Sequence, residues 1–286
     1  MTDKLDGRVA LVSGSGRGIG REIALKLASE GARLVINDLD ADPANETAEA
    51  IRAAGGEAVV CAGSVTEDGF AERFIKTGVD SFGGLDIIVN NAGYTWDSVV
   101  QKMTDEQWQA IIDVHMTAPF RILRAAQPII SAKAKEEAAA GQEVFRKVVN
   151  ISSIAGTGGN AGQINYSAAK AGILGVTKTM AKEWGRYKVN VNAVAFGPIR
   201  TRLTEGSADG GNTITVENRD IKVGVNPDLL SQMERMIPLG RVGTLDDCAN
   251  MAMMLATDLT SYVTGAIIPV DGGRTMTGGG SYGSKV

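Results

Sequence analysis

The chain of 286 residues has little cysteine, little net charge and no long apolar run. Its two cysteines, Cys61 and Cys248, stand in apolar contexts, which predicts buried free thiols in a reducing cytoplasm. The formal net charge of −4 excludes a strongly basic surface, so neither nucleic acid nor an anionic membrane is expected as a partner. No apolar run is long enough to span a bilayer, and the start lacks the basic region and apolar core of a signal peptide. These absences predict a soluble cytoplasmic protein, and we expect no metal site.

Apolar residues make up 44% of the chain, enough for a large core in one folded unit. Short β-branched runs alternate with helical patterns, and most runs are almost continuously apolar, as in strands buried on both faces of a parallel sheet. The expected strands cover residues 8–13, 33–38, 57–62, 85–91, 147–152, 188–195 and 265–270. The alternation predicts right-handed crossovers and a single domain over residues 1–286, a doubly wound three-layer α/β Rossmann sandwich.

Helix boundaries are also visible in the sequence. Apolar residues recur on one helical face from Ile19 to Leu27, and Gly31 is expected to end that helix. Two pairs have capping-box spacing and predict later helix starts: Thr104 with Gln107, and Thr244 with Asp247.

Two segments interrupt the alternation. Residues 202–236 are expected to form a lid, because EGSADGGNTIT (205–215) has the small, polar composition of a mobile loop. Residues 226–240 then place Leu229, Leu230, Met233 and Met236 on one helical face, which could close over an apolar chain or pack on the body of the protein. The second segment is a glycine-rich tail, residues 274–286.

The first expected strand runs into the glycine-rich stretch SGSGRGIG at residues 13–20. Such a turn between a strand and a helix lets the backbone approach a pyrophosphate, and the helix N-terminus presents free N–H groups to it. Asp38 ends the next strand, 18 residues beyond Gly20, where a carboxylate accepts hydrogen bonds from the adenosine ribose hydroxyls. This context favours a dinucleotide site over a purely structural turn.

Tyr166 precedes Lys170 by four residues in INYSAAKAG, a run of otherwise small residues. The two side chains therefore lie on one helical face, a turn apart. A phenol with a pKa near 10 is a poor proton donor in water, and a nearby ammonium is expected to lower that pKa toward the working range. The alternative is a surface helix with an extended lysine, but the glycine-rich turn favours a catalytic pair.

Four motifs in this order resemble the short-chain dehydrogenase/reductase family: Gly14-x-x-x-Gly18-Ile19-Gly20, NNAG at 90–93, Ser153, and Tyr166-x-x-x-Lys170. The resemblance runs from about Leu5 to Gly273. Two stretches, NISSIAGTGGNAGQINYSAAKAG and IPLGRVGT, are similar to signatures of the bacterial 3-oxoacyl-acyl-carrier-protein reductases.

The resemblance implies roles for individual residues. Tyr166 would protonate the substrate carbonyl, Lys170 would bind the nicotinamide ribose, and Ser153 would hydrogen-bond the carbonyl oxygen, with Ser152 as the competing serine. The implied cofactor contacts, besides Tyr166 and Lys170, are Gly14, Ser15, Arg17, Gly18, Ile19, Gly20, Asp38, Ser64, Val65, Asn91, Ala92, Gly93, Gly197, Ile199 and Thr201.

The expected cofactor is NAD(H), because the carboxylate of Asp38 would repel a 2′-phosphate, whereas Arg17 argues for NADP(H) as the alternative. The expected reaction is reduction of a 3-oxoacyl thioester of acyl-carrier protein or coenzyme A. A dehydrogenase of a small alcohol, sugar or steroid is the alternative, as is a catalytically silent dinucleotide-binding redox sensor. The resemblance also implies a homotetramer.

The only histidine, His115, stands where most family members have an asparagine. By resemblance that helix lies beneath the active site and helps to hold a water on the proton path of the lysine. A histidine can join such a path, or it can fill space while its burial keeps it neutral. We favour the second interpretation and expect His115→Asn to retain activity.

Overall fold

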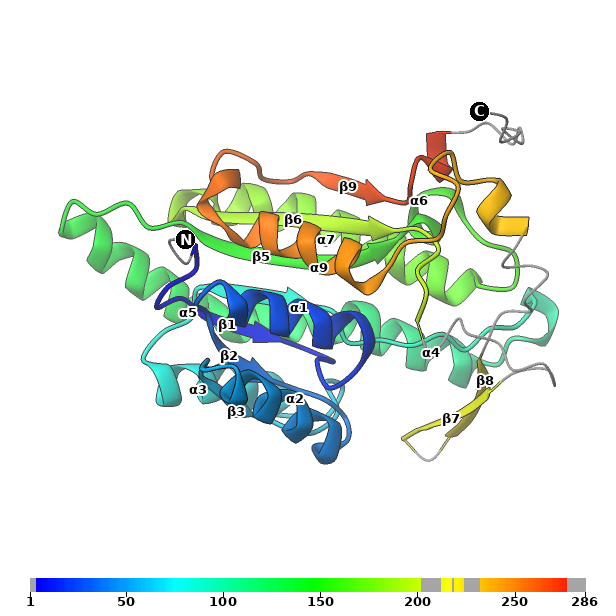
Figure 1. Ribbon diagram of the computed structural model, residues 1–286, viewed down its shortest axis with the longest axis horizontal. Coiled ribbons are helices and arrows are strands. Elements are labelled where there is room, and N and C mark those ends of the chain that lie inside the picture. The colour runs from blue at the N-terminus through cyan, green and yellow to red at the C-terminus, as the bar shows by residue number, and fades with distance from the viewer. Residues whose placement is uncertain (1–3, 202–211, 218, 224–231, 277–286) are drawn as a thin grey trace.

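Seven parallel strands form the central sheet of the computed structural model, which describes residues 4–201, 212–217, 219–223 and 232–276 (Figure 1). The strand order is β3-β2-β1-β4-β5-β6-β9. The strands are β1 (Val9–Val12), β2 (Arg33–Ile36), β3 (Ala58–Val60), β4 (Ile87–Asn90), β5 (Arg146–Ser153), β6 (Val189–Phe196) and β9 (Ile267–Val270). They overlap the seven predicted runs, so the predicted doubly wound α/β fold is confirmed.

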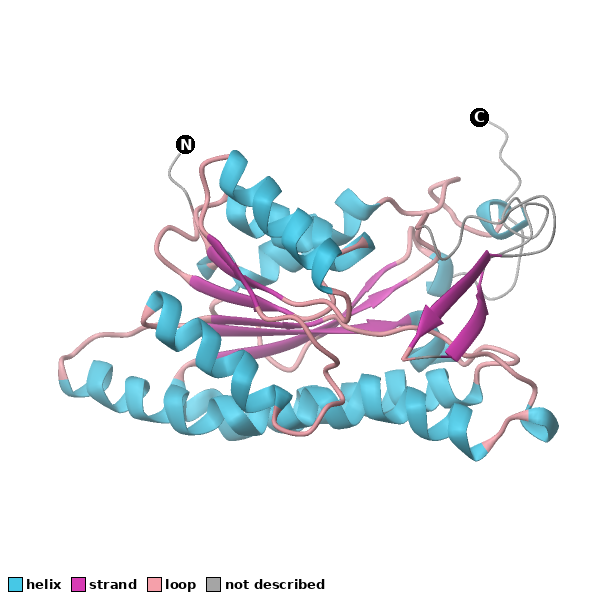
Figure 2. Ribbon diagram, turned by 90° about the horizontal axis from the view of Figure 1, so that it is seen from below, coloured by secondary structure: helices cyan, strands magenta, loops and turns pink. Residues whose placement is uncertain are grey.

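Helices cover both faces of the sheet (Figure 2). One layer consists of α1 (Gly18–Ser29), α2 (Ala41–Ala53) and α9 (Leu245–Ala256). The other consists of α3 (Phe70–Phe82), α5 (Ala118–Ala139) and α7 (Ile164–Trp184). Alternate residues of β1 enter opposite cores, Ala10 and Val12 with the first layer and Val9 and Leu11 with the second. This two-sided burial explains why the strands are apolar throughout.

Shorter helical elements lie between and after these strands and helices. They are η1 (Val100–Lys102), α4 (Asp105–Ile112), the π-helix η2 (Asp113–Thr117), α6 (Ile154–Gly158), η3 (Gly185–Tyr187), η4 (Asp258–Thr260) and η5 (Arg274–Met276). Both predicted capping boxes are present, at the start of α4 and at the start of α9. Helix α1 ends at Ser29, and Gly31 follows with φ +95, as predicted.

The loop prediction after β6 was wrong for its last residues. Residues 212–215 belong to an antiparallel hairpin of β7 (Asn212–Val216) and β8 (Arg219–Val223), which lies beyond the carboxyl end of the sheet (Figure 2). The rest of the predicted lid falls partly on residues 202–211, 218 and 224–231, outside the described residues, as do Leu229 and Leu230. Most of the predicted tail, residues 277–286, lies outside them too.

None of the helices in the described ranges is long and apolar enough to cross a membrane. Cys61 and Cys248 are both buried and free.

Candidate active site

The glycine-rich turn joins β1 to α1 at the carboxyl edge of the sheet, beside the point where the strand order reverses between β1 and β4. Gly14 has φ +62, and a Cβ there would lie 2.7 Å from the Cα of Ala92; a Cβ at Gly20 would lie 2.1 Å from the carbonyl oxygen of Gly14. Helix α1 has no side-chain cap from Arg17, so its first-turn N–H groups are available to an anion. The turn therefore fits the pyrophosphate of a dinucleotide.

The segment after β4 supports this turn. Asn91 donates from Nδ2 to the carbonyl oxygens of Ser13 at 3.0 Å and Gly14 at 2.9 Å. The backbone N–H groups of Asn91 and Ala92 both donate to Ser13 Oγ. The side chain of Asn91 thus holds the backbone of the glycine-rich turn in place. Sequence reasoning missed Ser13, although it directly precedes the first glycine of the motif.

Asp38 follows β2 and faces the same turn. Its Oδ2 accepts a hydrogen bond from the backbone N–H of Gly16 at 3.1 Å. Burial raises its pKa above the ordinary value, against the lowering effect of its hydrogen bonds and of Arg17. Arg17 itself forms an ion pair with Asp40 at 2.9 Å. The structure therefore places a carboxylate at the expected ribose position and directs the nearby arginine to a second carboxylate.

The remaining predicted cofactor contacts lie on the same carboxyl edge. Ser64 and buried Val65 follow β3. Beyond β6, the N–H of Gly197 donates to Val270 O at 3.0 Å, and buried Ile199 forms a parallel bridge with Gly243. Thr201 ends this described stretch.

Tyr166, Lys170 and Ser153 meet at the start of α7 and the end of β5. The Nζ of Lys170 lies 5.5 Å from the ring centroid of Tyr166 and donates to Ile151 O at 2.7 Å. Ser153 lies beside the Tyr166 side chain, where it acts to lower the pKa of the phenol. The hydroxyl of Ser152 instead donates to Lys170 O at 2.8 Å and is buried. The structure thus brings Ser153, and not Ser152, to Tyr166.

The charges of this pair differ from the expectation. Burial raises the pKa of Tyr166 to about 12, and the nearby Ser153 side chain only partly opposes this rise. Burial also lowers the pKa of Lys170 to about 7. The predicted lowering of the Tyr166 pKa by an ammonium was therefore wrong for the protein alone, because burial desolvates both groups.

Comparison with known proteins places this geometry in a family. Residues 14–275 match the family model described as Enoyl-(Acyl carrier protein) reductase. A 3-oxoacyl-[acyl-carrier-protein] reductase from Synechocystis is 38% identical over 95% of this chain and 98% of its own length. The chain belongs to the short-chain dehydrogenase/reductase family. The predicted resemblance is confirmed, and the chain is an oxidoreductase of this family.

Further relatives show the breadth of substrates in the family. The FabG 3-oxoacyl-[acyl-carrier-protein] reductase of Staphylococcus epidermidis is 36% identical over 93% of this chain and 98% of its own. A solved gluconate 5-dehydrogenase from Burkholderia cenocepacia, in complex with NADP and tartrate, has a TM-score of 0.82 at 28% identity, covering 96% of this chain and 98% of its own. Family membership therefore indicates a nicotinamide dinucleotide but leaves the substrate to be determined.

His115 of this short-chain dehydrogenase/reductase lies in the π-helix η2, beside Tyr166 and Lys170. Its ring meets Tyr166 edge-on with centroids 5.1 Å apart, and its Nε2 lies 2.8 Å from Tyr94 O. Burial, helped by the charge of Lys170, lowers its pKa well below 6.5. The ring fills the space above Gly93, where a Cβ would lie 2.0 Å from it. The neutral ring expected from the sequence is present.

Asn165 is a positioning residue that sequence reasoning missed. It is fully buried, donates from Nδ2 to Trp96 O at 3.2 Å and to Gln107 O at 3.1 Å, and accepts from Tyr166 N at 2.8 Å. These bonds tie the start of α7 to the segment after β4. In the sequence, the one sign of this role was the position of Asn165 directly before Tyr166.

Proposed function

We propose that this short-chain dehydrogenase/reductase reduces 3-oxoacyl thioesters, held on acyl-carrier protein or coenzyme A, to 3-hydroxyacyl thioesters with NADH. The observation that carries the proposal is the placement of Ser153 and buried Lys170 beside Tyr166, on the same sheet edge as the anion-binding turn. The substrate class is supported by the 3-oxoacyl-[acyl-carrier-protein] reductases that match nearly the whole chain. The assembled triad also argues against the silent redox sensor.

In this reaction the nicotinamide supplies the hydride to the carbonyl carbon. Tyr166 donates its phenolic proton to the carbonyl oxygen, and Ser153 Oγ–H donates a hydrogen bond to the same oxygen as negative charge develops there. Lys170 acquires its full positive charge when anionic groups bind nearby, and that charge then favours the phenolate left on Tyr166. Ile151 O and the helix hold the ammonium one turn from the phenol.

We propose NAD(H) as the preferred cofactor. A carboxylate at Asp38 accepts hydrogen bonds from a 2′-hydroxyl and repels a 2′-phosphate. The competing residue, Arg17, is neutralised by Asp40 at 2.9 Å. Kinetics with both cofactors test this: kcat/KM is expected to be higher with NADH, and Asp38→Ala is expected to reduce that preference. A higher kcat/KM with NADPH in the unmodified protein would contradict it.

A second candidate is a sugar or other polyhydroxy substrate, favoured by one carboxylate. Asp97 Oδ2 accepts a hydrogen bond from Gln163 Nε2 at 2.7 Å, and its charge acts on Tyr166. A carboxylate whose charge acts on the acid suits hydroxyl groups better than an apolar chain. The gluconate 5-dehydrogenase neighbour supports this candidate.

The deciding experiment follows NADH oxidation with acetoacetyl-CoA and acetoacetyl-acyl-carrier protein beside 5-ketogluconate. We expect kcat/KM to be highest with one of the thioesters, and Asp97→Asn to change it little. A preference for the sugar that Asp97→Asn abolishes would establish the second candidate instead.

We also propose a cytoplasmic homotetramer. Exposed apolar side chains on the helical surface support assembly: Phe120 on α5 is 51% exposed and Ile164 at the start of α7 is 46% exposed. Light scattering on the purified protein is expected to give four times the chain mass.

A further inference from the structure

The β7–β8 hairpin is anchored on both sides of the point where the strand order reverses. Its turn residue Glu217 bonds to the loop after β3, and the first residue of β8, Arg219, bonds to the region after β4. Strands β3 and β4 lie on opposite sides of β1 in the sheet. Both views place the hairpin beyond the carboxyl end of the strands (Figures 1 and 2). A dinucleotide binds along this edge, so the hairpin borders its site.

The first anchor lies at the adenosine end of that site. Glu217 Oε1 accepts hydrogen bonds from Ser64 Oγ and from Thr66 Oγ1, the latter at 3.1 Å. The loop that carries both hydroxyls is fixed beside Asp38, because the N–H of Gly63 donates to Asp38 O at 3.0 Å. Since Asp38 is the ribose carboxylate, the base attached to that ribose lies next to this loop and to Glu217.

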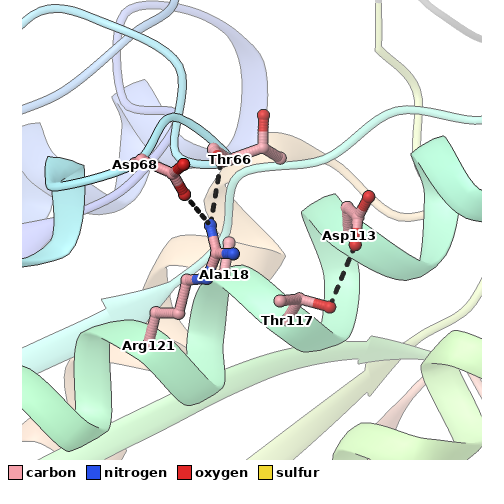
Figure 3. A pocket seen from close by; sticks show the side chains of 6 residues that line it. All are labelled: Thr66, Asp68, Asp113, Thr117, Ala118 and Arg121. Atoms are coloured by element: carbon pink, nitrogen blue, oxygen red, sulfur yellow. Dashed lines mark hydrogen bonds and ion pairs between the residues drawn. The ribbon is translucent and has the colours of Figure 1, made fainter.

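Arg121 of helix α5 also holds the loop after β3 in place. Arg121 donates from Nη1 to Thr66 O at 3.1 Å and pairs with Asp68 at 3.3 Å, at the edge of a cavity of about 180 Å³ (Figure 3). Glu217 therefore bonds to a loop that is itself held by Arg121 and Asp38.

The second anchor holds the nicotinamide side of the hairpin. Arg219 donates from Nε to Glu106 Oε1 at 2.8 Å and from Nη1 to Glu217 Oε2 at 3.0 Å. Its guanidinium also lies 5.7 Å from the ring centroid of Trp96. Arg219 thus bonds to Oε2 of Glu217, while Oε1 bonds to the loop after β3.

Glu217 is an ionised acceptor there. Burial acts to raise its pKa, but the hydrogen bonds from Ser64 and Thr66 and the contacts with Arg219 outweigh it, so the pKa lies below the ordinary value. An ionised carboxylate offers about four lone-pair positions. Among the described residues, Ser64 and Thr66 take two positions on Oε1 and Arg219 takes one on Oε2, which leaves one position on Oε2 for a further donor. Adenine carries one exocyclic donor, its 6-amino group.

We propose that Glu217 accepts a hydrogen bond from the 6-amino group of the cofactor's adenine, so that the hairpin holds the adenosine end of NAD(H) and selects adenine. This inference rests on the proposed NAD(H) site. It assigns a base-selecting contact to a residue 153 positions away in sequence from Ser64.

The test measures equilibrium binding and dissociation rate of NADH by fluorescence, and compares NADH with reduced nicotinamide hypoxanthine dinucleotide, in which oxygen replaces the 6-amino group. The unmodified protein is expected to bind the hypoxanthine analogue about tenfold more weakly, the effect of one hydrogen bond to a charged group. Glu217→Ala is expected to bind both alike within about twofold and to release NADH about tenfold faster.

Two further variants separate the contact from the integrity of the hairpin. Asp220→Asn is the matched control, because Asp220 accepts a hydrogen bond from Thr215 within the hairpin; it is expected to discriminate as the unmodified protein does. Glu217→Gln keeps an acceptor oxygen without the charge and is expected to lie in between. Equal binding of both dinucleotides by the unmodified protein, or full discrimination by Glu217→Ala, would overturn the inference, whereas failure to bind NADH at all would overturn the proposed function.

Discussion

Replacing His115 by asparagine tests whether the only histidine moves protons or fills space. Burial and the charge of Lys170 lower its pKa well below 6.5, so the ring is neutral at working pH. Because Tyr94 O can only accept, the hydrogen bond at 2.8 Å fixes the proton on Nε2. Nδ1 is then a bare acceptor, and it is buried without a hydrogen-bond partner among the described residues. A ring in this state directs its one N–H proton to Tyr94 O and not to Lys170.

The expected cost of His115→Asn is therefore in stability. The variant loses one hydrogen bond and leaves Tyr94 O unpaired, which destabilises the fold by about 1–3 kcal/mol. For a chain of this size each kcal/mol lowers Tm by about 2–4 °C. Turnover at pH 7 is expected to change by about threefold at most, since general acid–base catalysis, which typically contributes ~100-fold or more, is not removed.

The assay combines kcat between pH 6 and 9, NADH binding by fluorescence, and urea unfolding. His115→Gln, whose longer side chain brings its amide donor nearer to Tyr94 O, is the matched variant and is expected to lose less stability than His115→Asn. A loss of about 100-fold or more in turnover at pH 7, with fold and NADH binding intact, would refute the reasoning and make His115 an essential member of the proton path.

Three other predictions follow from buried groups. Tyr166→Phe keeps the ring but removes the transferable proton, so kcat is expected to fall by about 100-fold or more while fluorescence titration shows retained NADH binding. The free energy of unfolding of the cofactor-free protein is expected to rise from pH 7 to 8.5. The reason is that a lysine in the unfolded chain binds more protons in this range than Lys170 does in the folded protein, where its pKa is about 7. Urea unfolding would show a slope of at most about 1.4 kcal/mol per pH unit. Glu137→Gln leaves the charge of Arg146, 4% exposed and paired with Glu137 at 2.6 Å, without its nearest counter-ion, and is expected to lower the free energy of unfolding by about 3–5 kcal/mol.

Each of these has a control. Retention of more than about a tenth of the activity in Tyr166→Phe would exclude that residue as the acid. Lys170→Met is expected to abolish the rise with pH, and an unchanged rise would assign it to another group. Glu136→Gln alters an exposed neighbour paired with Lys133 and is expected to cost less than about 0.5 kcal/mol; equal effects of Glu136→Gln and Glu137→Gln would contradict the argument from burial.

The fold could be predicted because each strand is buried on both faces. Residues 9–12 alternate between two cores, so every position must be apolar and the strand is visible without knowing its partners. The β7–β8 hairpin was missed for the opposite reason. Within the described ranges its strands pair only with each other, beyond the carboxyl end of the sheet, and the small polar residues before Asn212 dominated the pattern.

The sequence by itself determined the local geometry of the site. The spacing of Tyr166 and Lys170 on one helix places them a turn apart, and the turn at Gly14 requires glycine whatever surrounds it. These features depend on backbone geometry over a few residues, which a short stretch of sequence specifies.

Tertiary structure alone decided the charges and the long-range contacts. Burial moves the pKa of Tyr166 to about 12 and that of Lys170 to about 7, the reverse of what their proximity predicted. The packing also directs the Ser152 hydroxyl to the carbonyl oxygen of Lys170 and places Ser153 beside Tyr166. The same packing brings Glu217 into contact with Ser64, which is 153 positions away in the sequence. Desolvation and contacts between distant segments depend on how whole layers pack, and no local pattern in the chain encodes that packing.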